Sequence, residues 1–204
     1  MAYYFDFSFD RIVPGIGFVG GFPARNEKYY KGYEVYHYDP ADIPTEAVVR
    51  SSHKIIPDFV PISGIMSVCP EVREVIEEME PGVHEFFPVH IRPKTPSKVL
   101  LRRDKRPLAG PYYMLNVQTA IDAVCIERSD VDIHPVKSGL PFVSRRGMRG
   151  KIVLYGDKIS GHHLWRGRMQ LTQFRFFSDV LMKKIETGKF NGLEFTYFGS
   201  AEIL

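Results

Sequence analysis

The sequence predicts an α+β fold, with a mixed, mostly antiparallel sheet and a few short helices packed on one face. Three observations predict this fold. Segments in which apolar and polar residues alternate recur along the chain, as is typical of strands. Only two segments have the spacing of a short amphipathic helix. Each of these helices follows a predicted strand, which favours helices covering a sheet over a helical bundle.

The bulk composition indicates one folded domain. The chain has 204 residues, of which 44% are hydrophobic, so residues 1–204 can form a single domain with a full core. The net charge of +3 is only mildly basic and does not demand a nucleic-acid partner. The N-terminus has no leader-like pattern, and no apolar run approaches the roughly 18 residues that span a bilayer. We therefore expect a cytoplasmic protein.

The N-terminal part combines aromatic strands with loops. Residues 3–9 alternate aromatic and polar side chains and predict a half-buried strand. Residues 14–23 contain too many glycines and prolines for regular structure. Residues 29–38 hold five tyrosines and predict a strand or an extended edge. The prolines between residues 40 and 61 predict an irregular passage.

The first helix is predicted at residues 71–79, where one apolar stripe repeats at helical spacing. Ser67 precedes it as a candidate cap, and Pro70 is tolerated in the first turn. Residues 84–91 predict the next strand, which Pro88 places at a sheet edge or a bulge. The stripe consists of Val72, Val75, Ile76 and Met79.

The second half of the chain predicts further strands and one more helix. A basic, proline-punctuated loop is expected at residues 92–111, and a broken pattern at 129–150. The second helix begins after Ser178 and ends at Gly188. The predicted strands are residues 112–117, 123–127, 151–155, 163–169 and 193–198. The units around the two helices share a strand–helix–strand layout, which either reflects an internal duplication or is the recurrence of a common module.

Two histidines and two cysteines are the candidates for a chemical site. His162 and His163 resemble the paired histidines of metal-dependent nucleases, but no histidine follows them to complete a ligand set. We expect instead that one faces the core and the other the solvent. Cys69 precedes a proline at a helix start, where the helix dipole would lower its pKa. Cys125 lies between Val124 and Ile126, as an inert core residue would. We assign no catalytic residue, metal or cofactor.

Two charged surfaces are the candidates for partner contact. The polar side of the first helix bears Glu71, Glu74, Glu77 and Glu78, with Glu80 and Glu85 nearby. Such a face is usually solvated, yet this density of carboxylates can steer a basic partner. The basic run at residues 92–106 is the alternative, with Arg102, Arg103 and Arg106 as contacts. Trp165, the single tryptophan, is expected to pack in the core.

The order of several motifs resembles the eleventh-numbered immunity-protein family of bacterial polymorphic-toxin systems. The resemblance covers residues 57–198, and residues 1–56 lie outside it. The matching pieces are Pro57-Asp58-Phe59, the helix leading into GVHEFFPVHI, Tyr112–Val117 with AIDAVCIERS, GHHLWR, and FFSDVLMKKIETGKFNGLEFTYF.

The resemblance implies a non-enzymatic protein that binds and neutralises a cognate secreted antibacterial toxin domain, often a nuclease, by stoichiometric inhibition. We expect no direct contact with nucleic acid and none with a membrane. A rival hypothesis from the residues themselves is a nucleic-acid-binding protein, or a metal-dependent nuclease. That protein would use the basic loop 92–106 and His162/His163.

Overall fold

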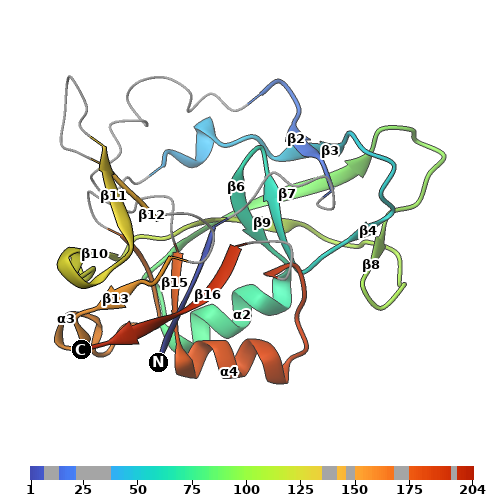
Figure 1. Ribbon diagram of the computed structural model, residues 1–204. Coiled ribbons are helices and arrows are strands. Elements are labelled where there is room, and N and C mark those ends of the chain that lie inside the picture. Colours follow the sequence, from blue (N-terminus) through green and yellow to red (C-terminus); the bar gives the residue numbers. More distant parts are fainter. Residues whose placement is uncertain (7–13, 22–37, 135–141, 146–149, 168–174, 194–196) are drawn as a thin grey trace.

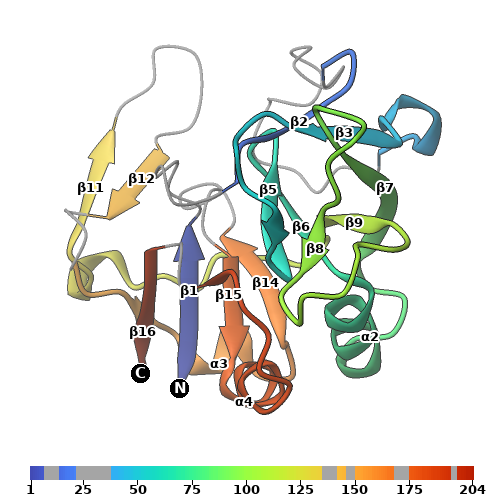
Figure 2. The same cartoon turned by 90° about the vertical axis from the view of Figure 1, so that its right-hand side faces the viewer.

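The computed structural model shows a closed β-barrel beside an open, six-stranded sheet (Figures 1 and 2). This arrangement agrees broadly with the predicted α+β class. The barrel and the open sheet each contain both parallel and antiparallel strand pairs. Closure of one set of strands into a barrel was not predicted. The structure describes residues 1–6, 14–21, 38–134, 142–145, 150–167, 175–193 and 197–204.

The barrel is built around strand β7, whose alternating burial follows from its sequence. Phe87, Val89 and Ile91 point into the core, whereas Pro88 and His90 are exposed. Pro88 lies opposite Tyr113 of β9. On the other side of β7, pairing with β3 begins only at His90, so the missing N–H of Pro88 removes no hydrogen bond between β7 and β3. In order, the barrel strands are β2 (Ile16–Phe18), β3 (Glu46–Val49), β7 (Glu85–Pro93), β9 (Tyr112–Asn116), β6 (Ile65–Val68) and β5 (Phe59–Ile62).

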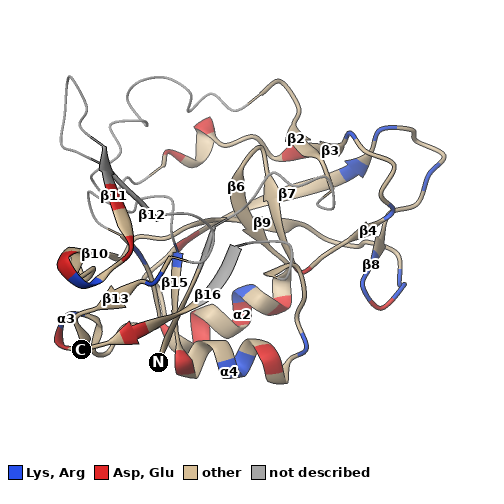
Figure 3. Cartoon of the chain, in the orientation of Figure 1, with Lys and Arg blue, Asp and Glu red and all other residues tan. Residues whose placement is uncertain are grey.

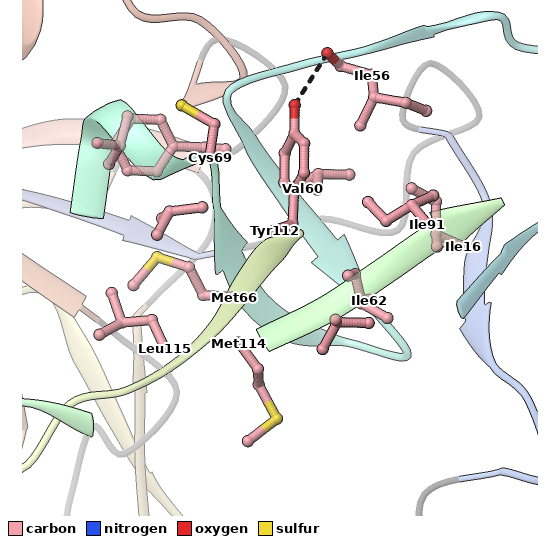
Figure 4. Packing of buried hydrophobic residues seen from close by; sticks show 14 of the residues in the cluster. Ile16, Ile56, Val60, Ile62, Met66, Cys69, Ile91, Tyr112, Met114 and Leu115 are labelled. Carbon is pink, nitrogen blue, oxygen red and sulfur yellow. Dashed lines mark hydrogen bonds between the residues drawn. The ribbon is translucent and has the colours of Figure 1, made fainter. Parts of the chain in front are cut away.

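The interior of the barrel is filled by aliphatic, methionine and aromatic side chains (Figure 4). Tyr112 enters this core with its ring and donates its hydroxyl to the Ile56 carbonyl oxygen at 3.4 Å. The hydroxyl is thus satisfied, as a buried polar group must be. Ile56 belongs to a short ribbon of β4 (Ile55–Ile56) and β8 (Leu101–Arg102) on the outside of the barrel.

Strands β14 and β15 of the open sheet are buried on both faces. Leu164 and Phe177 pack into the barrel core, while their neighbours Trp165 and Phe176 pack into a second core. Alternation along strands explains the division. The predicted core position of Trp165 is confirmed. In order, the sheet strands are β10 (Ala120–Ile121), β14 (Leu164–Gly167), β15 (Arg175–Ser178), β1 (Ala2–Asp6), β16 (Tyr197–Ile203) and β13 (Val153–Leu154).

The strand–helix–strand layout occurs twice, once in each β structure. Strands β6 and β7 both pair antiparallel with β9, and α2 (Pro70–Met79) connects them. Strands β15 and β16 both pair antiparallel with β1, with α4 (Asp179–Thr187) between them in the chain. The two helices contact each other beneath the sheets (Figure 1). Within the described residues, no helix is both long and apolar enough to cross a membrane.

The two helix starts differ from each other. Ser178 caps α4 as predicted, since its Oγ accepts a hydrogen bond from the Leu181 amide at 3.1 Å. Ser67 does not cap α2, because it is buried in β6 and the N-cap residue is Cys69. Pro70 occupies the first turn, where its missing N–H has no consequence.

Several predicted segments are corrected. The passage between residues 40 and 61 was expected to be irregular, but it holds a 3-10 helix, η2 (Pro40–Asp42), and strands β3, β4 and β5. Strands β3 and β4 lie between its prolines, whereas β5 includes Pro61, which lies opposite Met66 of β6 while β5 pairs with β2 at Ile62. Residues 123–127 form no strand. Cys125 instead precedes η3 (Ile126–Arg128), another 3-10 helix. The broken segment contains a ribbon of β11 (Val131–His134) and β12 (Phe142–Arg145). The predicted strands at 7–9, 29–37, 168–169 and 194–196 lie outside the described residues.

Candidate functional site

The acidic face of α2 exists, but two of its four glutamates are paired within the chain. Glu71 Oε1 lies 2.6 Å from Arg102 Nη2, and Glu78 Oε1 lies 2.7 Å from Lys184 Nζ of α4. Glu77 accepts a hydrogen bond from the Gly82 amide at 3.3 Å. Glu74 is exposed. Figure 3 accordingly shows both signs of charge on α2 and α4.

The two surfaces that the sequence offered as alternatives meet at Glu71 and Arg102. Burial favours the neutral form of Glu71, but the hydrogen bonds to its carboxylate, first of all that from Arg102, together with the charge of Arg102 outweigh burial, so the pKa of Glu71 is lowered. Arg103 Nη1 approaches Asp58 Oδ2 at 3.9 Å. Arg106 pairs instead with Asp104 inside its own exposed loop. A cavity of about 160 Å³ lies beside these pairs. It is lined by Asp58, Glu71, Arg102, Arg103, Asp104, Gly188 and Phe190.

Asp58 connects the barrel to the chain after α4. Its Oδ2 accepts a hydrogen bond from the Asn191 amide, and Asn191 Oδ1 accepts one from the Asp58 amide, both at 3.0 Å. Burial raises the pKa of Asp58, which the Asn191 hydrogen bond and the charge of Arg103 oppose only in part. Asp58 therefore has a structural role at the border of the cavity.

The cysteines are free and buried. Burial raises the pKa of the Cys69 thiol far above its ordinary range, so the predicted lowering by the helix dipole is wrong. Desolvation outweighs the dipole because the thiol is fully enclosed. Cys125 is buried near Glu127, with Sγ 3.5 Å from its Oε2.

His162 and His163 belong to a polar cluster that joins the two β structures. Glu80 Oε1 accepts a hydrogen bond from the His163 amide, and Glu80 Oε2 accepts one from the Leu164 amide, both at 2.9 Å. His84 Nε2 lies 2.8 Å from Glu80 Oε2, and His163 Nδ1 lies 2.9 Å from Ser178 Oγ. Among the described residues, no group of three metal-ligating side chains occurs.

This cluster was missed in the sequence, where Glu80 was counted with the solvated carboxylates. It is 7% exposed and lies at the C-cap of α2. His162 and His163 are both half-buried just before β14, so the expected division between core and solvent does not apply to them. One sequence signal could have indicated the cluster. His84 follows Glu80 by four positions, and Pro81-Gly82 between them marks the end of the helix.

Comparison with models of protein families identifies the class of this chain as the immunity proteins. The matching model is the immunity protein family (Imm11), over residues 20–200. Because this match covers most of the 204 residues, the chain belongs to the Imm11 family. A search of curated proteins found no match. The resemblance stated from the motifs is confirmed, and the match begins upstream of the core at residues 57–198. Membership indicates a non-enzymatic role with a toxin protein as partner.

Proposed function

We propose that this chain neutralises a cognate antibacterial toxin domain by forming a stoichiometric complex with it in the cytoplasm. The observation that carries the proposal is membership of the Imm11 family over residues 20–200. The complex either covers the active site of the toxin or holds that site in an inactive state. The chain itself contributes shape and charge and changes no covalent bond.

Protection by this route requires tight binding, since a few free toxin molecules can kill a cell. Nanomolar affinity corresponds to about −12 kcal/mol at a standard concentration of 1 M. Affinity of this kind usually comes from a few well-packed side chains surrounded by charges that steer the encounter. The exposed residues Glu74 and Glu78 of α2 are the first candidates for such steering, toward the cationic groove of a nuclease toxin.

The loop that carries Arg102, Arg103 and Arg106 is the second candidate. Arg103 and Arg106 are exposed, whereas Arg102 is engaged with Glu71. A partner that contacts α2 near Glu71 would therefore also meet this loop, so the two candidates form one surface with both signs of charge.

Co-expression tests the proposal. A candidate toxin domain, taken from a reading frame next to that of this chain, is expressed in a bacterial host with and without the chain, and growth is measured. We expect growth to be restored only with the chain, and the two proteins to purify together in a 1:1 complex. Restored growth without any complex would contradict binding as the mechanism.

The nucleic-acid hypothesis is tested with the purified chain alone. His162 and His163 are engaged with Glu80 and Ser178, an arrangement that gives no support to a nuclease site. A nuclease would cleave DNA or RNA in the presence of divalent metal ions. We expect no cleavage, and at most weak binding that disappears as salt is raised.

A further inference from the structure

A basic cleft lies at one corner of the barrel, where the segment after β3 meets the segment after β7. Its volume is about 250 Å³. Serine and threonine hydroxyls share its lining with the basic side chains, and none of the described residues that line it is acidic. Figure 3 shows the same corner as a series of basic positions beyond β7. The basic lining residues are Arg50, His53, Lys54, Lys94 and Lys98.

Backbone hydrogen bonds hold the segments that carry these basic residues in place. The Arg50 amide donates to the Gly15 carbonyl oxygen at 2.7 Å. On the opposite side, the Lys98 amide closes a turn on the Thr95 carbonyl oxygen at 3.0 Å. The Leu101 amide then donates to the Lys54 carbonyl oxygen at 2.8 Å, which joins the two segments. The two segments that line the cleft are therefore brought together by the fold itself.

The size of the cleft favours side chains of a protein over a small molecule. Small-molecule sites usually occupy about 300–1,000 Å³, and the cleft is smaller than that range. It suits one or two carboxylate side chains, which lysine and arginine bind through charge-assisted hydrogen bonds.

Exposed apolar side chains next to the cleft also indicate a protein partner. Ile55 directly follows Lys54 and is 45% exposed, and Val99 directly follows Lys98 and is 59% exposed. Apolar groups surrounded by charge are typical of protein interfaces. Single-stranded nucleic acid would instead be expected to stack its bases on aromatic rings. None of the described lining residues is Phe, Tyr or Trp.

We propose that this basic corner, residues 50–55 and 93–100, binds an acidic segment of the toxin domain. Carboxylates of that segment occupy the cleft, and its apolar side chains pack on Ile55 and Val99. The inference rests on the proposed function and adds a contact surface that is distinct from the face of α2. The toxin would then present a basic region to α2 and an acidic segment to the basic corner.

Affinity measurements with an inactivated form of the toxin domain that the co-expression experiment identifies test the inference. Lys98→Glu reverses one charge of the cleft, and Val99→Asp places a carboxylate on the apolar contact. Each substitution should weaken binding about tenfold or more, as for a buried charged or apolar contact. The control is Lys158→Glu, which makes the same charge change at an exposed position of helix α3 (Gly156–Ile159), outside both candidate surfaces, and should leave affinity within about twofold. Melting temperatures of all variants confirm that the fold is intact.

The outcomes separate this inference from the proposed function. If the wild-type chain binds the toxin and both corner variants bind equally well, the basic corner is not a contact, while neutralisation by binding stands. If the wild-type chain does not bind the toxin, the proposed function and the inference both fail. A third arm uses a single-stranded oligonucleotide with the chain alone. Tight binding that Lys98→Glu abolishes and Val99→Asp leaves unchanged would assign the corner to nucleic acid and overturn the inference.

Discussion

Glu80 Oε2 lies 2.8 Å from His84 Nε2, and both side chains are buried where α2 ends and β7 begins. The same carboxylate accepts the amides of His163 and Leu164 at the start of β14. One side chain of the barrel half of the molecule thus satisfies two backbone donors of the open sheet. Breaking these contacts leaves buried polar groups without partners, which costs more than the net gain of a typical hydrogen bond.

Replacing Glu80 should therefore lower stability strongly. In Glu80→Gln one amide oxygen remains as an acceptor, but the new NH2 group faces backbone donors. We expect a loss of about 2–4 kcal/mol in the free energy of unfolding, measured by denaturant titration. The control Glu78→Gln affects only the exposed pair with Lys184 and should cost less than about 1 kcal/mol. Equal effects of the two substitutions would contradict the role assigned to Glu80.

The stability of the wild-type chain should also depend on Glu80 in acid. Burial opposes its charged form, but the hydrogen bonds from His84 and His163 outweigh burial and lower its pKa below the ordinary 4.5. A carboxyl with a lowered folded-state pKa stabilises above its unfolded-state pKa, and this contribution is lost as the pH falls through the folded-state value. The stability difference between wild type and Glu80→Gln should therefore shrink below about pH 4.5. A difference that stays constant from neutral pH to about pH 3 would be inconsistent with this coupling.

The end of α4 offers a test of backbone strain. The C-cap residue Gly188 has a helical φ of −70°, whereas the following Lys189 has a φ of +54°. A residue with a Cβ is disfavoured there, so Lys189→Gly should stabilise the protein by about 0.5–1 kcal/mol. In Gly188→Ala the new Cβ would come within 2.4 Å of the Phe190 ring, and we expect a loss of about 1–3 kcal/mol. Thermal melts of both variants measure these stability changes. Stabilisation by Gly188→Ala would contradict the close approach of the Phe190 ring to Gly188.

Local pattern was enough to predict the helices α2 and α4 and several strands, because alternation and helical spacing are properties of neighbouring residues. The apolar stripe of α2 and the Ser178 cap of α4 were found in this way. The pairing of strands could not be predicted, since it depends on contacts between distant residues. Strand β1, near the N-terminus, pairs with β16, near the C-terminus, and no local pattern encodes that partner or the closure of the barrel.

The sequence could predict which residues of the candidate surfaces are charged, but not which residues of the chain they pair with. The sequence shows that Glu71 and Arg102 are charged, yet only the fold brings them to 2.6 Å. Glu80 was grouped with the solvated carboxylates because a run of like charges usually faces water. Its burial follows from the contact between the end of α2 and the start of β14, which are separated by more than eighty positions in the chain.

Trp165 should be the largest single contributor to the second core. Its ring stacks on Phe176 with centroids 5.5 Å apart and an interplanar angle of 7°. Among the described residues its indole N–H has no hydrogen-bond partner, so Trp165→Phe removes contact area but no hydrogen bond. We expect losses of about 1–3 kcal/mol for Trp165→Phe and about 3–5 kcal/mol for Trp165→Ala. Circular dichroism during denaturation measures the free energy of unfolding of both variants. Equal losses would contradict a contribution of the stacked aromatic ring to stability.

The face of α2 is best tested at Glu74, because this exposed side chain can be changed without breaking the pair of Glu71 with Arg102 or that of Glu78 with Lys184. If α2 steers a basic toxin, Glu74→Lys should slow association several-fold at low salt, by roughly 2–10 times, and leave dissociation nearly unchanged. The difference from wild type should shrink as salt screens the charges. Asp157→Lys, an equal charge change on the separate helix α3 (Gly156–Ile159), is the control. Stopped-flow binding measures the rates. Equal slowing in both variants would show an effect of net charge only, and no slowing in either would remove α2 from the contact surface.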